Sequence, residues 1–193
     1  MTRLMSSFKL LLLIIAFSAI SKVHSTTLLE IFEKNLNPVF ITVNNGAGQE
    51  GIHDALLAGF PQIFVAEVSQ YTFEADFILF GSYPNVHLLL GNPAAILTQI
   101  VTNLNQRATI WFGAPISPSI IAELNSIAMS PIKDNAIIID HINQYSQQDQ
   151  KQILKIINGI NPHYRISYEH IHPHNRVLIA TVHKHGHGHG HGH

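Results

Sequence analysis

The sequence predicts an α/β domain in which helices cover both faces of a mostly parallel β-sheet. From residue 39 onward, short apolar runs rich in β-branched residues alternate with longer segments whose apolar residues recur at helical spacing. Near-continuous apolar strands joined by helices are typical of a three-layer α/β/α architecture. The last two runs, 163–169 and 176–182, are separated only by a turn, which predicts an antiparallel hairpin at the end of the sheet.

Each element has its own local signal. The predicted strands are the apolar, β-branched runs 39–43, 62–68, 86–90, 108–112, 136–140, 163–169 and 176–182. The predicted helices, each with an apolar face, are 49–59, 70–80, 93–106, 117–129 and 146–160. A leading helix is expected within 26–38, packed on the sheet or on its edge.

Capping residues predict where several of these helices begin and end. Gly59 suits the left-handed position that closes a helix, so it ends 49–59. Ser117 as the N-cap and Pro118 as the first helical residue predict the start of 117–129. Ser146 and Asp149 have the spacing of a capping box at the start of the last helix.

The N-terminal segment 1–25 has the pattern of a secretory signal peptide. Two basic residues precede an apolar run at 10–20, and the small residues Val23 and Ser25 stand before the expected cleavage point. The run is shorter than the ~20 apolar residues that span a bilayer, although a membrane anchor is the alternative. The prediction is a secreted or periplasmic protein whose folded domain covers 26–182.

Composition narrows the class of partner. Only 12% of the residues are charged, against about 25% on average, and the net charge is −1. Removing the signal peptide takes away three basic residues and no acidic one, which argues against nucleic-acid binding. The absence of cysteine excludes thiolate catalysis and cysteine metal sites. We expect a small-molecule or metal-ion partner and no membrane contact after cleavage; a protein partner stays open.

A glycine-rich turn after the first strand is the first candidate site. Gly46, Gly48 and Gly51 stand in the turn after the strand and in the first turn of the next helix, where backbone N–H groups can face a ligand. Glu67 ends the second strand, about 20 residues further on, where an acid can hold a ribose diol. The alternative is a tight turn without a ligand and a solvated glutamate.

The ordered series of segments over 39–182 resembles the class I S-adenosylmethionine-dependent methyltransferases. The matching segments are GIHDALLAGFPQIFVAEVSQ (51–70), NVHLLLGNP (85–93), ATIWFGAP (108–115), AIIIDHI (136–142), INPHYRISYE (160–169) and RVLIATV (176–182). The resemblance implies a Rossmann-like methyltransferase fold that binds S-adenosylmethionine. It also implies that Asp140 and His141 are catalytic, beside the methyl acceptor. The implied cofactor-binding residues are Asn44, Asn45, Gly46, Gly48, Glu67, Gly91 and Asn92.

Several polar positions of that family pattern are changed. Residues that replace or lack an expected acid or histidine are Val43 or Asn44, Asn92, Gly113, Pro115 and His141. A hydrogen bond to a charged group contributes about 1.5–3 kcal/mol, so several such losses weaken cofactor binding severely. Export also separates the protein from the cytosol, where this cofactor is made. The sequence therefore predicts a catalytically impaired methyltransferase-like domain; an active enzyme, with Asn44, Asn45 and Gln49 as substitutes, is the alternative.

Histidines form the second candidate site. The tail 183–193 alternates histidine with glycine and is predicted to be disordered, and neutral imidazole is a ligand for Zn, Ni or Cu. The predicted metal ligands are His183, His185, His187, His189, His191 and His193. A purification tag or a repeat without a role is the alternative, and a transition-metal-binding protein is a third possible function. Upstream, His170, His172 and His174 with Glu169 form either a second metal cluster or an exposed turn.

Overall fold

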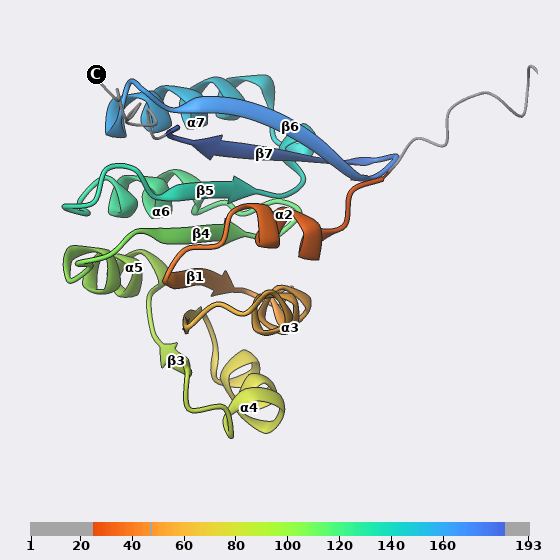
Figure 1. Cartoon of the computed structure of the whole chain (residues 1–193), viewed down its shortest axis with the longest axis vertical. Coiled ribbons are helices and arrows are strands. Elements are labelled where there is room, and N and C mark those ends of the chain that lie inside the picture. Colours follow the sequence, from red (N-terminus) through yellow and green to blue (C-terminus); the bar gives the residue numbers. More distant parts are fainter. Residues whose placement is uncertain (1–24, 47, 184–193) are drawn as a thin grey trace, which may run out of the picture.

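The computed structural model describes residues 25–46 and 48–183 and confirms the predicted three-layer architecture (Figure 1). One sheet contains β1 (Val39–Asn44), β2 (Gln62–Glu67), β3 (Val86–Leu90), β4 (Ala108–Phe112), β5 (Ala136–Ile139), β6 (Arg165–His172) and β7 (Asn175–Thr181). The strand order is β3-β2-β1-β4-β5-β7-β6. Strands β1 to β5 run parallel, and β7 lies antiparallel to both β5 and β6, as the predicted hairpin requires.

Helices cover both faces of this sheet. They are α2 (Leu28–Lys34), α3 (Gln49–Ala58), α4 (Gln70–Phe80), α5 (Pro93–Thr102), α6 (Ile120–Ile127) and α7 (Gln147–Ile160), with a short 3₁₀ turn η1 (Ile142–Gln144). The buried apolar residues of α2, α3 and the end of α4 pack together on one face. Those of α5, α6 and α7 pack on the other face. Strand order reverses between β1 and β4, which makes their carboxyl ends the expected position of a ligand.

Two of the three predicted helix ends agree with the structure. Gly59 closes α3 in the left-handed conformation, with φ of 89°. Ser146 caps α7 by accepting a hydrogen bond from the backbone of Asp149, although the reciprocal bond of a capping box is absent there. The start of α6 was predicted two residues too early. The Ser117 backbone N–H donates to the Tyr145 hydroxyl, so this residue is held in the loop, and Ser119 is the N-cap.

An aromatic cluster fixes the sheet face that carries α2 and α3. The ring of Phe32 meets Phe40, Phe60 and Trp111 edge-on, with centroids between 4.9 and 6.1 Å apart. Gly51 of α3 lies directly over Trp111, because a Cβ atom there would stand 1.9 Å from the indole ring. This close approach holds the indole at the carboxyl end of β4.

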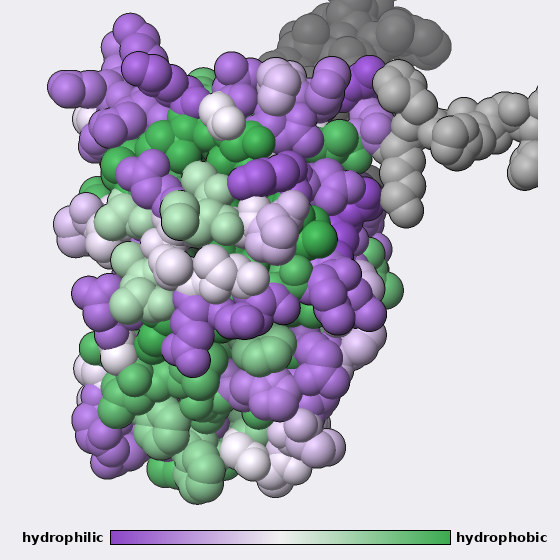
Figure 2. Space-filling model, turned by 90° about the vertical axis from the view of Figure 1, so that its left-hand side faces the viewer, coloured by the Kyte–Doolittle hydropathy of each residue, from purple (hydrophilic) through white to green (hydrophobic). Residues whose placement is uncertain are grey.

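Apolar side chains also reach the surface at the β3 edge of the sheet. Phe77, Ile78, Leu79 and Leu90 are between 46% and 82% exposed. Figure 2 shows apolar surface at the lower end of the molecule, where α4 and β3 lie in Figure 1. Within the described residues, no helix has both the length and the apolar character needed to cross a membrane. The predicted signal peptide lies almost entirely outside the described residues, since only Ser25 belongs to them.

Candidate functional site

The side chain of Asn44 organises the glycine loop from inside. Asn44 ends β1 and is only 1% exposed. Its Oδ1 accepts hydrogen bonds from the backbone N–H groups of Gly46 and Gly48, both at 2.9 Å. Gly46 has a left-handed φ of 110°, and a Cβ atom at Gly48 would stand 2.8 Å from Asn44. The loop therefore needs these glycines, and two of its N–H groups are satisfied within the protein.

A buried carboxyl pair lies beside this loop. Asn44 Nδ2 donates to Oδ2 of Asp76 on α4 at 2.6 Å, and Glu67 is the register partner of Asn44 on β2. Both Glu67 and Asp76 are 0% exposed. Burial raises the pKa of Glu67 to about 9; hydrogen bonding to Asp76 and its charge add to the rise, while Thr72 and Asn44 oppose it. Glu67 is therefore protonated at neutral pH, and the neighbouring Asp76 adds to this preference for the neutral form.

The sequence did not reveal Asp76 as part of this site. It lies within the predicted helix 70–80, whose other residues include only one further acid, Glu74. An acid among the apolar residues of a helix is a signal for a buried partner. Its partners lie on β1 and β2, 32 and 9 residues earlier in the chain, so only the tertiary structure shows which residues they are.

The predicted cofactor residues gather at the carboxyl ends of β1, β2 and β3. The backbone N–H of Gly91 donates to the Glu67 carbonyl at 3.1 Å. Asn45, Gly46, Gly91 and Asn92 are exposed around this edge. The Asn92 side chain is already used, because its Oδ1 accepts from the backbone of Ala95 and caps α5. Asn44, Gly48 and Glu67 lie underneath and are buried.

Between the carboxyl ends of β1 and β4 there is a cavity of only about 10 Å³. It is lined by Val43, Asn45, Phe112, Gly113, Ala114, Ser117, Glu123 and Tyr145. A volume of this size corresponds to about one water molecule. Among the described residues, this cavity on its own therefore has no room for a cofactor.

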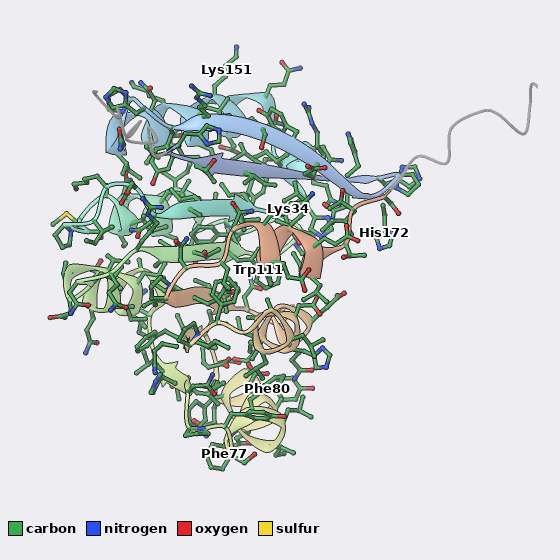
Figure 3. All side chains as sticks on the ribbon, in the orientation of Figure 1. Lys34, Phe77, Phe80, Trp111, Lys151 and His172 are labelled. Atoms are coloured by element: carbon green, nitrogen blue, oxygen red, sulfur yellow. The ribbon has the colours of Figure 1, made fainter. Side chains whose placement is uncertain are left out.

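A larger pocket lies at the carboxyl ends of β4 and β5, and we call it the Asp140 pocket. It has a volume of about 230 Å³, and its lining residues are Leu28, Glu50, Trp111, Gly113, Pro115, Asp140, His141, Ile171, His172 and Asn175. Figure 3 labels two of these, Trp111 between α2 and α3 in this view and His172 near the end of the hairpin. Both predicted catalytic residues line this pocket, whereas Glu67 and the glycines of the loop do not.

Asp140 and His141 are held in place by the neighbouring strands. The Asp140 backbone N–H donates to the Phe112 carbonyl at 2.9 Å, and the His141 N–H donates to Asn175 Oδ1 at 3.0 Å. His141 has a left-handed φ of 54°. Burial raises the pKa of Asp140 to about 7; the Trp111 indole opposes this rise and the charge of Glu50 adds to it. Burial lowers the pKa of the His141 imidazole, which keeps it neutral.

The structure describes only some of the histidines that the sequence predicts as metal ligands. Across residues 25–46 and 48–183, no group of three histidine, aspartate or glutamate side chains is placed to hold a metal ion. His170, His172 and His174 are exposed around the hairpin turn, and Glu169 accepts a hydrogen bond from Thr26, so the upstream metal cluster does not form. His183 is exposed; the other five predicted tail ligands lie outside the described residues.

The parallel sheet that ends in an antiparallel β5-β7-β6 arrangement is the Rossmann-like fold of class I S-adenosylmethionine-dependent methyltransferases, and comparison with solved structures confirms it. The O-methyltransferase from Bacillus cereus in complex with SAH has a TM-score of 0.58 and 11% identity, covering 91% of this chain and 90% of that one. Spermidine synthase from Thermotoga maritima has a TM-score of 0.58 and 10% identity, covering 80% of this chain and 57% of that one. A SAH-bound methyltransferase from Podospora anserina has a TM-score of 0.54 and 12% identity, covering 81% and 76%.

These similarities concern the fold alone. This chain spans a little over half of the spermidine synthase chains that it matches, at 57% and 58%. No protein-family model matches the sequence, and no curated protein matches it.

Proposed function

We propose that this protein is a methyltransferase-like binding domain whose use of S-adenosylmethionine is impaired. The observation that carries the proposal is the burial of Glu67. A ribose diol needs a carboxylate that faces the outer edge of the sheet, but this carboxyl group is 0% exposed and lies beside Asp76, which helps to keep it protonated. A protonated, buried glutamate is a poor acceptor for two ligand hydroxyl groups.

The surrounding residues support the same proposal. The Gly46 and Gly48 N–H groups, which could face a ligand, donate to Asn44 instead. Asn92 caps α5, and the nearby cavity of about 10 Å³ cannot accept the methionine part of the cofactor. The residues present therefore do not fit S-adenosylmethionine in this arrangement.

Calorimetric titration with S-adenosylmethionine and with S-adenosylhomocysteine tests the proposal. We expect dissociation constants weaker than about 100 μM for both ligands, since binding must open the Glu67–Asp76 pair and the loop. Far-ultraviolet circular dichroism of the same sample confirms that the protein is folded. Binding tighter than this limit would contradict the proposal.

An active methyltransferase is the second candidate, and the Asp140 pocket favours it. A carboxyl group with a pKa of about 7 is suited to general-base catalysis at neutral pH. In that case Glu67 would hold the ribose, the loop at 44–51 the methionine part, and Asp140 would lie near the acceptor. The same titration separates the two candidates, because an active enzyme needs the tighter binding.

We further propose that residues 1–25 direct export. Two basic residues, an apolar run at 10–20 and small residues before Thr26 support this proposal. Mass spectrometry of the protein recovered from the producing cells would give Thr26 as the first residue. An uncleaved N-terminus would contradict export by a signal peptide.

The histidine-rich tail is proposed to bind a divalent transition metal such as Zn, Ni or Cu. The described residues hold no three-residue metal group, so most of the affinity must come from the tail. A chain that ends at Val182 lacks all six tail histidines. We expect its affinity for Zn or Ni, measured by calorimetry, to fall at least about tenfold relative to the full chain. Equal affinities would remove the tail from the function.

A further inference from the structure

The Asp140 pocket has the size of a site for a small compound. Its volume of about 230 Å³ lies slightly below the ~300–1,000 Å³ of pockets that take drug-sized ligands. Elements distant in sequence form its walls: Glu50 comes from α3, Trp111 from β4, and His172 from the end of β6. These elements pack into one core, so the pocket is built by the fold rather than by one loop.

One buried acceptor in this pocket has no partner. Asp140 is 5% exposed, and its Oδ1 atom receives no hydrogen bond. A buried carboxylate oxygen without a donor is unfavourable by about 1–3 kcal/mol or more. The Trp111 indole N–H is the nearby donor that lowers the Asp140 pKa, but it forms no hydrogen bond of normal geometry, so it relieves this only in part. A ligand that donates a hydrogen bond would satisfy Asp140.

The charges around the pocket favour a cation. Glu50 and Asp140 both line it, and no lysine or arginine is among its lining residues. His141 is kept neutral by burial, and Asp140 is ionised in solutions above neutral pH. A positively charged donor would therefore meet two carboxylates and no fixed positive charge.

The remaining walls favour an apolar body on that cation. Leu28, Pro115 and Ile171 are apolar, and Trp111 contributes an indole ring. Apolar and aromatic side chains around a few polar groups are the usual composition of a small-molecule site. An aromatic face can also attract an ammonium group.

We propose that the Asp140 pocket binds a small organic amine in its ammonium form, with the ammonium group on Asp140 and Glu50 and the apolar part against Leu28, Ile171 and Trp111. This site is separate from the proposed impairment at Glu67, since the two sets of residues share no member.

Titration of the ¹⁵N-labelled full chain with benzylamine tests the proposal at about pH 8, where Asp140 is mostly ionised. Trp111 is the only tryptophan, so its indole N–H gives one signal from the pocket wall. Benzyl alcohol and benzoate are matched probes without the positive charge. We expect saturable shifts of the Trp111 signal with benzylamine, with an affinity about tenfold or more above that for benzyl alcohol. Equal affinities, or tighter binding of benzoate, would overturn the proposal.

Variants of Asp140 and Glu50 test whether their carboxylates cause the preference for benzylamine over benzyl alcohol. Asp140→Asn should reduce the preference for benzylamine over benzyl alcohol by about tenfold, and Glu50→Gln by a smaller factor. Glu50 is exposed, so its variant tests the proposal even where Asp140→Asn does not fold. Glu74→Gln, on the exposed side of α4 and outside the pocket, is the matched control and should leave the preference unchanged. An unchanged preference in Glu50→Gln and in a folded Asp140→Asn would overturn the proposal.

The outcomes remain distinguishable from those of the cofactor titration. Tight binding of S-adenosylmethionine would contradict the impaired cofactor site and leave the amine site standing. Failure of benzylamine would remove the amine site and leave the impaired cofactor site standing.

Discussion

Replacing Glu67 with glutamine is expected to stabilise the folded protein in neutral to alkaline solution. Burial, with Asp76 beside it, raises the Glu67 pKa from 4.5 to about 9. The folded state therefore keeps a proton that the unfolded chain releases between these two pH values. Stability from this group is complete below about pH 4.5 and is lost as the pH rises toward about 9. Glutamine carries no such proton and removes this loss.

Urea unfolding at about pH 6 and about pH 8 measures the effect. One retained proton changes the free energy of unfolding by about 1.4 kcal/mol per pH unit, so the wild type should lose roughly 3 kcal/mol from Glu67 between these conditions. Glu67→Gln should lose about that much less. Asp140 also has a raised pKa, but it contributes equally to both proteins. The variant Glu74→Gln, at an exposed glutamate, serves as the control. Equal pH dependence of the unfolding free energy in wild type and Glu67→Gln would show that the folded protein does not keep a proton on Glu67.

Restoring an acid at the end of β1 is expected to damage the fold rather than repair the site. Asn44→Asp would place a third carboxyl group beside Glu67 and Asp76. It would also remove the side-chain N–H group that now donates a hydrogen bond to Asp76. The expected loss in the free energy of unfolding is about 3 kcal/mol at about pH 8, since buried charges without partners are strongly unfavourable.

Exchanging the two residues gives the decisive comparison. In Asn44→Asp with Asp76→Asn, the carboxylate would accept from Gly46 and Gly48, and the new amide on α4 would donate to it. We expect the double variant to recover most of the stability lost by Asn44→Asp. A double-mutant cycle from urea unfolding would then give an interaction energy of roughly 2–3 kcal/mol. Additive effects of the two single variants would contradict the pairing.

The sequence by itself determined the architecture. Alternation of apolar strands with amphipathic helices predicted the three-layer sheet, and the turn between the last two runs predicted the hairpin of β6 and β7. The caps at Gly59 and Ser146 were also readable, because a cap bonds to its own helix within a few residues. These features depend on local periodicity and local hydrogen bonds, which a single sequence contains.

Only the tertiary structure decided the chemistry of the site. The sequence predicted Glu67 at the end of its strand, but it did not predict that Glu67 is buried beside Asp76. It also indicated only that Asn44 replaces an acid, whereas the structure shows that Asn44 organises the loop. It also started α6 too early, because the Tyr145 hydroxyl that holds Ser117 comes from a distant segment. Accessibility and pKa depend on side chains brought together from different elements, and a pattern of neighbours along the chain does not contain those contacts.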